Sequence, residues 1–282
     1  MAILIKGSEL AQKIKEDIKN QVLELGIKPG IAVIIVGDDP ASKIYVGKKE
    51  KETLEAGFHS VVVRLNKDIS QIDLENKIDA LNADSSIHAI LVQLPIPKHL
   101  DTDAIIERIL PQKDVDGFHP LNVGKLWIGL ETYAIPCTPY GVIKLLEEYN
   151  IPVSGKHAVI IGRSNIVGKP MASLLLSRNA TVTVCHSKTA NLKEIASQAD
   201  ILVSAIGKPE FITEDFVKEG AVVIDVGINR TTDGKLVGDV DFKKVESKAG
   251  YITPVPGGVG LMTRAMLLSN TLDLYKRQTE VK

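Results

Sequence analysis

The chain has 282 residues, of which 44% are hydrophobic, so it can fill the core of one large domain or of two ordinary ones. A formal net charge of −1 gives no general attraction to nucleic acid or to anionic membranes, so we expect neither as a partner and expect small ligands instead. Two distant cysteines argue against a zinc knuckle or a redox pair, so no metal is expected, and the absence of any signal-peptide or membrane-spanning pattern predicts a soluble cytoplasmic protein.

The first half of the chain alternates helices and strands. Apolar periodicity predicts a helix at 8–26, a strand at 31–36, a helix at 41–56, a strand at 61–65, a helix at 70–83, a strand at 89–93 and a short helix at 102–110. Ser8 is the predicted N-cap of the first helix. Because Pro95 and Pro97 cannot continue a sheet interior, Gln93 is predicted at the carboxyl edge of a strand, where open α/β sheets bind ligands. Residues 111–139 lack periodicity and are predicted as loops.

A second βα series begins after these loops. Its predicted elements are a helix at 140–149, a strand at 157–161, a helix ending at 178, a strand at 181–185, a helix at 192–199, strands at 201–204 and 221–225, and a final helix at 259–275. The fresh start of the series predicts a domain boundary near 138–150. The final helix is expected to pack back on the first domain.

The strand at 157–161 leads into a glycine turn and a helix. Gly162 permits a tight turn, which would present unpaired N–H groups to an anion. The spacing from Gly162 to Gly168 departs from Gly-x-Gly-x-x-Gly, so an ordinary βα turn remains an alternative. NAD-binding folds usually place an acid about 20 residues later, whereas this chain has His186-Ser187-Lys188. With Arg163 in the turn, these residues favour the 2′-phosphate of NADP; the alternative is a solvated loop.

Two further positions are candidates for chemistry. Ser42, Tyr45 and Lys49 lie at i, i+3 and i+7, so they share one helix face, and a lysine beside a phenol in a partly dry site can act as a general acid or base. The alternative is a solvated lysine among neighbouring charges. Asp116, in a turn before Gly117, could accept hydrogen bonds from an amino-substituted heterocycle, or could bond its own backbone.

Six motifs in this order resemble the bifunctional methylenetetrahydrofolate dehydrogenase/methenyltetrahydrofolate cyclohydrolase family over nearly the whole chain. They are Tyr45-Val46-x-x-Lys49, Gln93-Leu94-Pro95-Ile96-Pro97, Lys113-Asp114-Val115-Asp116-Gly117-Phe118, Pro136-Cys137-Thr138-Pro139, Gly162-Arg163-Ser164-x-x-Val167-Gly168-x-Pro170 and Thr253-Pro254-Val255-Pro256-Gly257-Gly258-Val259-Gly260. Any one motif could arise by chance, but their ordered combination favours the enzyme over the separate alternatives.

The resemblance implies oxidation of 5,10-methylenetetrahydrofolate with NADP and hydrolysis of the product to 10-formyltetrahydrofolate. It makes Lys49 the catalytic lysine, assisted by Gln93, with Tyr45 packing beside the substrate and Asp116 anchoring the pterin. The implied substrate-binding residues are Ser42, Tyr45, Gln93, Leu94, Pro95, Asp116, Pro256, Gly257, Gly258 and Val259. The implied cofactor-binding residues are Thr138, Gly162, Arg163, Ser164, Val167, Gly168, Pro170, His186, Ser187 and Ile228.

The same resemblance implies an α/β fold of two domains and a homodimer. A folate-binding catalytic domain, 1–138 plus 259–282, is completed by the C-terminal helix, and a Rossmann-like NADP-binding domain, 139–258, is inserted in it, with the folate in a cleft between them. One position departs from the family pattern, because Leu261 stands where the family usually has proline. A monofunctional or NAD-preferring relative, and a non-catalytic folate-binding protein, are the alternative interpretations.

Overall fold

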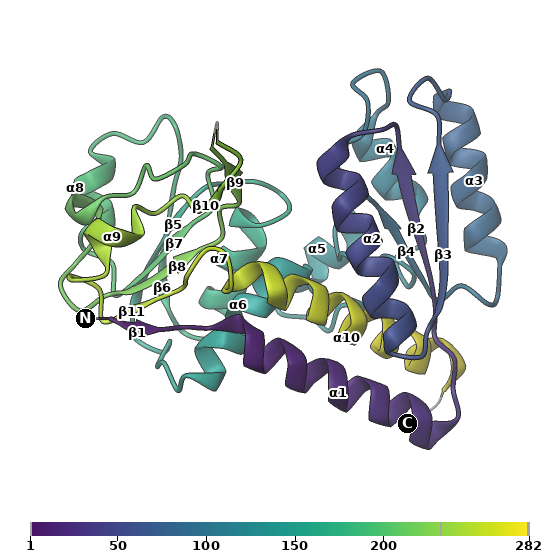
Figure 1. The fold of residues 1–282 in the computed structure, drawn as a ribbon, viewed down its shortest axis with the longest axis horizontal. Coiled ribbons are helices and arrows are strands. Elements are labelled where there is room, and N and C mark those ends of the chain that lie inside the picture. The colour runs from purple at the N-terminus through teal and green to yellow at the C-terminus, as the bar shows by residue number, and fades with distance from the viewer. Residues whose placement is uncertain (1, 232, 281–282) are drawn as a thin grey trace. The chain divides into compact units, whose positions relative to one another are not determined.

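The chain folds into two compact units in a computed structural model that describes residues 2–231 and 233–280 (Figure 1). Unit 1 contains the described residues up to Gln12 and Pro136–Met266, and unit 2 contains Lys13–Ile135 and the described residues from Leu267 onward. The helices α1 (Gly7–Leu25) and α10 (Val259–Thr279) each contribute to both units. The predicted two-domain α/β architecture is therefore present.

Unit 1 is built on a parallel six-stranded sheet. Its strand order is β1 (Ile3–Leu4), β11 (Tyr251–Ile252), β8 (Val222–Asp225), β7 (Ile201–Ser204), β5 (His157–Ile161) and β6 (Thr181–Cys185). The central strands β7 and β8 are buried along their whole length, as continuous apolar runs in a covered parallel sheet require. Helices α6 (Cys137–Glu148), α7 (Gly168–Leu176), α8 (Leu192–Ala196) and α9 (Phe242–Val245), the 3₁₀ helix η1 (Glu214–Phe216), and a hairpin of β9 (Asn229–Arg230) and β10 (Leu236–Val237) surround the sheet.

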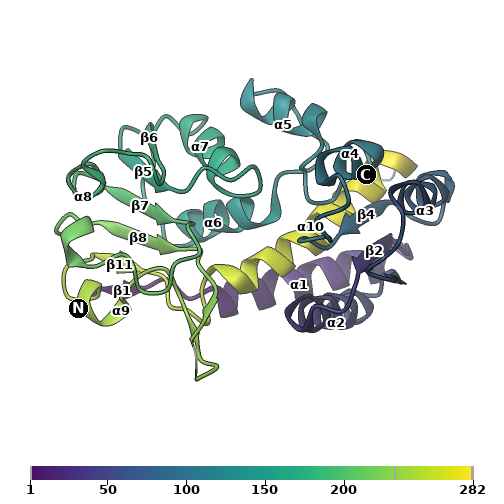
Figure 2. The same ribbon diagram turned by 90° about the horizontal axis from the view of Figure 1, so that it is seen from above.

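Unit 2 has a parallel three-stranded sheet in the order β3 (His59–Leu65), β2 (Gly30–Val36) and β4 (Ala89–Val92). Its helices are α2 (Pro40–Glu55), α3 (Gln71–Ala83), α4 (Thr102–Arg108) and α5 (Pro120–Trp127). Within this unit α2 lies on one face of the sheet and α3 and α4 lie on the other (Figure 2), as right-handed βαβ crossovers on either side of a central first strand require. Buried Leu74 and Ile78 of α3 fill the second face.

The unit boundaries differ from the domain ranges expected from the resemblance. The first residues form β1, whose Ile3 N–H donates to Gly250 O at 2.8 Å, so the N-terminal segment completes the unit 1 sheet. Unit 1 also extends beyond residue 258 to Met266. The final helix does contribute to unit 2, where Leu268 and Leu272 pack in one apolar cluster with Phe58.

Three details of the predicted elements are wrong. Ser8 is not the N-cap of the first helix, because α1 already begins at Gly7. The region predicted as loops contains α5, whose start is capped by the His119 ring accepting from Leu121 N. It also contains the first turn of α6, which tolerates Pro139 because first-turn N–H groups need no helical partner.

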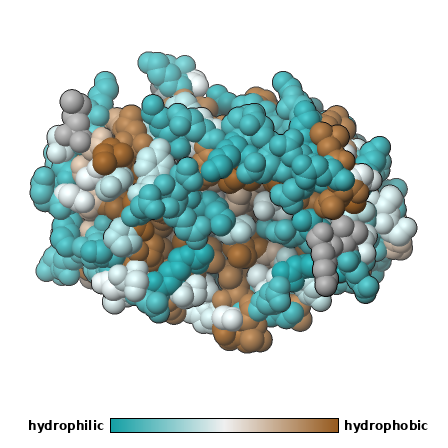
Figure 3. Space-filling view, turned by 90° about the horizontal axis from the view of Figure 1, so that it is seen from below, coloured by the Kyte–Doolittle hydropathy of each residue, from teal (hydrophilic) through white to brown (hydrophobic). Residues whose placement is uncertain are grey.

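Hydrophilic side chains cover much of the molecular face in Figure 3, with hydrophobic side chains in smaller groups among them. Within residues 2–231 and 233–280, no helix combines the length and the apolar character needed to cross a membrane.

Candidate active site

Helix α2 carries the first group of predicted residues. The Asp39 carboxylate accepts from Ser42 N at 2.7 Å and Pro40 occupies the first turn, so the start of the helix is fixed by its own sequence. Ser42 is only 6% exposed, whereas Tyr45 and Lys49 are half-buried. Tyr45 and Lys49 are therefore the more accessible members of this face.

Lys49 and Gln93 meet directly, although 44 residues separate them. Lys49 Nζ donates to Gln93 Oε1 at 3.0 Å. Gln93 follows β4, and its backbone N–H donates to Ile34 O of the neighbouring β2 at 2.8 Å, which confirms its predicted place at the carboxyl edge of the sheet. Because β2 is followed by β3 on one side and β4 on the other, this edge is a topological switch point, where ligands bind in open α/β sheets.

Asp116 reaches the same edge from a third segment. Residues 113–115 run beside β4, with Ile90 N donating to Lys113 O at 2.7 Å and a parallel bridge between Ile90 and Asp114. Two residues farther along each segment are Val92 and Asp116. Asp116 therefore lies near the end of β4, and it lines a hollow of about 10 Å³ whose other lining residues include Leu94.

The first two residues of the Lys-Asp-Val-Asp-Gly motif have structural partners. The buried Lys113 ammonium donates to three carbonyl oxygens near the end of α3, those of Leu81, Asn82 and Asp84, at 2.8–3.2 Å. The Asp114 carboxylate accepts from Asn122 Nδ2 and from His119 N, both at 2.8 Å, and burial raises its pKa to about 6. These contacts hold the loop, and Asp116 of the same motif is half-buried.

In unit 1 the glycine turn follows β5 as predicted. Gly162 has φ +130°, and a Cβ atom at this position would lie 2.3 Å from Ala205 O. A Cβ on Gly168 would lie 2.2 Å from Gly162 O. Both positions therefore require glycine, because the turn folds closely over the ends of two strands.

The expectation of unpaired N–H groups is wrong for the second half of the turn. Ser164 Oγ accepts from Val167 N at 3.2 Å and from Gly168 N at 3.3 Å, and Ser164 O accepts from Lys169 N at 3.0 Å. Pro170, the next residue, has no N–H. Ser164 thus satisfies the start of α7, and an anion at this turn would depend more on cationic side chains.

Those side chains come from two adjacent strand ends. Ile161 and Cys185 are register partners, and Gly162 N donates to Cys185 O at 2.9 Å, so Arg163 and His186 leave the sheet side by side. Arg163 is exposed, and so are Ser187 and Lys188 of the neighbouring segment. His186 Nδ1 accepts from Lys188 N at 3.1 Å, which assigns the proton of the neutral ring to Nε2. These donors fit a phosphate group.

The strand order β6-β5-β7-β8 creates a second switch point, between β5 and β7. The loop after β7 contacts the end of β5, since Ala205 N donates to Ile161 O at 2.8 Å. Ile228 follows the next strand, β8, and is 45% exposed. The predicted cofactor residues of unit 1 are thus brought to the carboxyl edge, apart from Thr138 in α6.

The remaining predicted residues also belong to unit 1. Thr138 Oγ1 lies 2.9 Å from Thr263 Oγ1 of α10. Pro256 is exposed, whereas Gly258 and Val259 are buried. Gly257 O accepts from Gly7 N at 2.9 Å, which attaches this Pro- and Gly-rich loop to the start of α1.

Two buried acids near the carboxyl edge of the unit 1 sheet were not predicted from the sequence. Asp225, at the end of β8, accepts from the backbone N–H groups of Gly227, Asp239 and Val240 at 2.9 Å each. Asp239 is completely buried and accepts from five donors. The glycines beside them were the sequence feature that could have indicated these acids, because a Cβ on Gly227 or Gly238 would collide with one of the two carboxylates.

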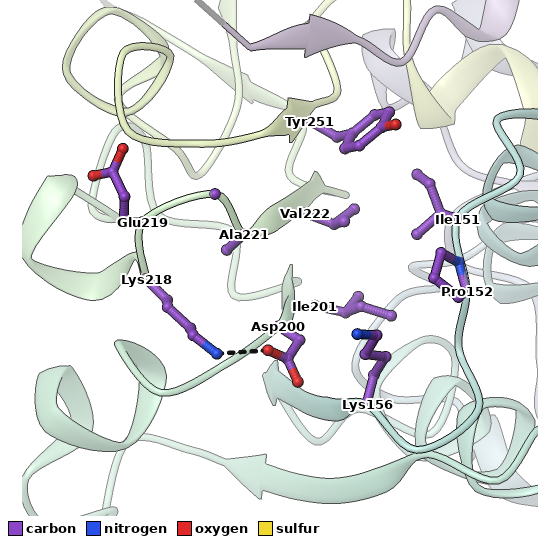
Figure 4. A pocket seen from close by; sticks show the side chains of 11 residues that line it. Ile151, Pro152, Lys156, Asp200, Ile201, Lys218, Glu219, Ala221, Val222 and Tyr251 are labelled. Carbon is purple, nitrogen blue, oxygen red and sulfur yellow. Dashed lines mark hydrogen bonds and ion pairs between the residues drawn. The ribbon is translucent and has the colours of Figure 1, made fainter.

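A hollow of about 260 Å³ lies at the opposite edge of the unit 1 sheet, at the amino ends of β7, β8 and β11 (Figure 4). Lys218 Nζ pairs with Asp200 Oδ1 at 2.6 Å, and Asp200 Oδ2 accepts from His157 N at 2.9 Å. These contacts lower the pKa of Asp200. None of the predicted site residues lines this hollow, so we assign its ion pair to holding the start of β5.

Comparison with known proteins identifies both parts of the chain. Residues 5–116 match the catalytic domain, and residues 136–279 the NAD(P)-binding domain, of tetrahydrofolate dehydrogenase/cyclohydrolase. A relative from Bacillus mycoides, the bifunctional protein FolD, is 55% identical over 280 residues, which cover 98% of each chain. The chain belongs to the tetrahydrofolate dehydrogenase/cyclohydrolase family.

Solved structures agree with this assignment. The bifunctional FolD enzyme of Campylobacter jejuni is 53% identical with a TM-score of 0.96, covering 99% of this chain and 100% of that chain. The FolD enzyme of Trypanosoma brucei, complexed with NADP cofactor and inhibitor, is 39% identical with a TM-score of 0.95, covering 99% of each chain.

The predicted fold class and the predicted enzyme family are both confirmed. As a tetrahydrofolate dehydrogenase/cyclohydrolase, the chain is an enzyme with a catalytic domain and an NAD(P)-binding domain. In the part of the chain that the structure describes, no group of three or more His, Cys, Asp or Glu side chains is arranged to hold a metal ion.

Proposed function

We propose that the chain oxidises 5,10-methylenetetrahydrofolate to 5,10-methenyltetrahydrofolate with NADP and hydrolyses that product to 10-formyltetrahydrofolate. The observation that carries this proposal is the 3.0 Å hydrogen bond between Lys49 Nζ and Gln93 Oε1 at the switch point of the unit 2 sheet. It joins two motifs of the family resemblance into one pair of polar groups.

Binding and orientation are the main tasks in the oxidation step. NADP, when bound, supplies the carbon that accepts the hydride. Asp116 anchors the pterin through its carboxylate, which suits the N–H donors of an aminopyrimidinone ring. Tyr45 packs against the folate, and Leu94 and Pro95 form part of the same surface. The remaining substrate contacts are assigned to Ser42, Pro256, Gly257, Gly258 and Val259.

Hydrolysis requires proton transfers, which we assign to Lys49. Water adds to the cationic methenyl carbon and loses a proton. The bond from this carbon to N5 then breaks as N5 gains a proton, and the hydroxyl group gives its remaining proton to solvent to become the formyl carbonyl. Lys49 serves as the group that accepts and returns a proton, because it is the half-buried amine on the α2 face. Gln93 orients that amine, and its own amide is fixed by donating from Nε2 to Leu94 O at 2.8 Å.

Cofactor binding is assigned to unit 1. Arg163, His186 and Ser187 provide donors for the 2′-phosphate, since β5 and β6 end side by side. Gly162 and Gly168 keep the turn close to the strand ends, where a Cβ would collide with backbone oxygen. Ser164, Val167 and Pro170 shape the start of α7, and Thr138 and Ile228 complete the set.

Further parts of the proposal concern the state of the enzyme. It acts as a homodimer in the cytoplasm, without nucleic acid or membrane partners. Cys137 and Cys185 are both buried and are not joined in a disulfide, which suits a reducing compartment. Light scattering of the purified protein tests the dimer, and cell fractionation tests the location.

The decisive test measures both reactions in purified wild-type protein and in Lys49→Met. Methenyltetrahydrofolate opening is followed without cofactor, and NADP binding is measured separately by titration. We expect loss of opening activity with little change in NADP affinity. The neighbouring exposed Lys48→Met is the matched control and should retain activity. A Lys49→Met enzyme that opens the substrate at the wild-type rate would contradict the assignment.

The same assays distinguish the alternatives. A wild-type protein that reduces NADP but leaves methenyltetrahydrofolate unchanged would be monofunctional. Faster turnover with NAD than with NADP would instead place the chain among NAD-preferring relatives.

A further inference from the structure

We propose that Asp239 is a positioning residue for the cofactor: its buried carboxylate fixes the loop 205–208 after β7 so that the loop offers acceptors to the nicotinamide ribose half. This inference deepens the proposed function and rests on its assignment of cofactor binding to unit 1. Asp239 lies outside every motif that carried the family resemblance.

The Asp239 carboxylate accepts hydrogen bonds from most of the backbone N–H groups of the loop 205–208. Asp239 Oδ2 accepts from Ile206 N at 2.8 Å and from Gly207 N at 3.2 Å, and Oδ1 accepts from Lys208 N at 2.9 Å. Ser204 Oγ, at the end of β7, donates to Oδ2 at 3.3 Å. Three successive N–H groups thus converge on one side chain, and a carboxylate holds them more strongly than a neutral acceptor would.

Asp239 also ties this loop to the next strand. Its Oδ1 accepts from Asn229 Nδ2 at 3.0 Å, in the segment that follows β8. The backbone of Asp239 is fixed in turn, because its N–H donates to Asp225 Oδ1 at 2.9 Å. A Cβ on Gly227 would lie 2.3 Å from Asp239 Cγ, so the chain is shaped around this carboxylate.

The loop occupies the right place to touch the cofactor. It begins at the switch point, where Ala205 packs directly on Gly162 of the phosphate-binding turn. Arg163 and His186 place the 2′-phosphate at the β5 and β6 ends, so a dinucleotide that crosses the sheet extends its other half over β7.

The hydrogen bonds determine the chemistry of that surface. Since the N–H groups of 206–208 point to Asp239, the loop is not a second anion-binding turn. Its backbone carbonyl oxygens are the polar atoms left for a ligand. They suit hydroxyl and carboxamide donors, which are the groups of a nicotinamide ribose.

The test compares wild type with Asp239→Asn in both reactions. An amide has one acceptor oxygen and directs N–H donors at the loop, so we expect KM for NADP to rise at least about tenfold. KM for NAD should rise by the same factor, because the 2′-phosphate contacts are unchanged. Turnover at saturating NADP and cofactor-free hydrolysis of methenyltetrahydrofolate should each change less than about twofold. Asp241→Asn, two residues away and bonded to Lys244, is the matched control.

Unchanged cofactor KM values in a folded Asp239→Asn protein would overturn the inference, and so would parallel loss of both reactions in proportion to lost thermal stability. If Asp239→Asn does not fold, Asn229→Ala provides the test, since it removes one donor to the Asp239 carboxylate and leaves the carboxylate in place. Its KM for NADP should rise about threefold, and an unchanged KM would overturn the inference. Failure of the proposed function looks different, because wild type would then not saturate with NADP.

Discussion

Replacing Asp225 by asparagine should change how the stability of the protein depends on pH. Burial raises the pKa of Asp225 from its ordinary 3.8 to about 7, against the opposing effect of three backbone donors. The native state therefore keeps a proton that the unfolded chain releases. The stability linked to this proton is fully present below pH 4 and is lost as pH rises through 7.

The size of the effect follows from the two pKa values. Between pH 5 and pH 8, titration of Asp225 should lower the free energy of unfolding by about 3 kcal/mol. Asparagine does not titrate, so the free energy of unfolding of Asp225→Asn, relative to that of the wild type, should increase by that amount between pH 5 and pH 8. The amide also lacks one acceptor oxygen, which adds a cost that does not depend on pH.

Urea unfolding of both proteins at pH 5, 6, 7 and 8 measures this difference. The raised pKa of Asp114 also affects each curve, but it is common to both proteins and cancels. Asp241→Asn is the control, because its bond with Lys244 lowers the pKa of Asp241 from its ordinary 3.8. A constant difference from pH 5 to pH 8 is therefore expected for this variant. A constant difference for Asp225→Asn as well would refute the reasoning.

Three other outcomes are expected. Arg163→Ala should raise KM for NADP far more than KM for NAD, measured by steady-state kinetics; equal increases would reject the contact with the 2′-phosphate. Gly162→Ala should lower the free energy of unfolding by at least about 2 kcal/mol, because its φ is +130° and the new Cβ would collide with Ala205 O. Gly155→Ala is the control and should lower it less, because Gly155 also has a positive φ but has open space around the new Cβ. Similar urea midpoints for the two variants would disprove the clash. Leu261→Pro should leave the melting temperature nearly unchanged, since it removes only the 3.4 Å bond from Leu261 N to Gly258 O, but should change KM for the folate; an unaltered KM would show that the departure has no effect on binding.

The regular βα units could be predicted from the sequence because each has a long apolar period or run. Strand β5 and the glycine turn lie where predicted, and so does Gln93 at the end of β4. The strands β1 and β11 were missed because two residues carry no periodicity. Helix α5 was hidden by the glycine, proline and asparagine around it, and its start depends on the His119 ring rather than on a common capping residue.

The candidate site also contains residues that local sequence predicts and residues whose position depends on the folded sheet. The spacing on α2 predicted a shared face for Tyr45 and Lys49, and the structure adds the contact with Gln93, which depends on strand order rather than on local spacing. Within one motif, the sequence did not distinguish Lys113, which binds carbonyl oxygens near the end of α3, from Asp116, which lies at the sheet edge. Asp239 was missed because its five donors come from segments that only the folded sheet brings together.

The division of the chain between the units also sets the order of events during its synthesis. Unit 1 needs both its N-terminal strand and residues up to Met266, and unit 2 includes the chain from Leu267 onward, where the Gln278 amide donates to His88 O and Gln112 O. A nascent chain on the ribosome therefore holds an incomplete version of each unit until α10 has been synthesised. Interruption of synthesis before α10 would leave both units incomplete and with exposed apolar surface, which makes such truncation products natural clients of chaperones and proteases.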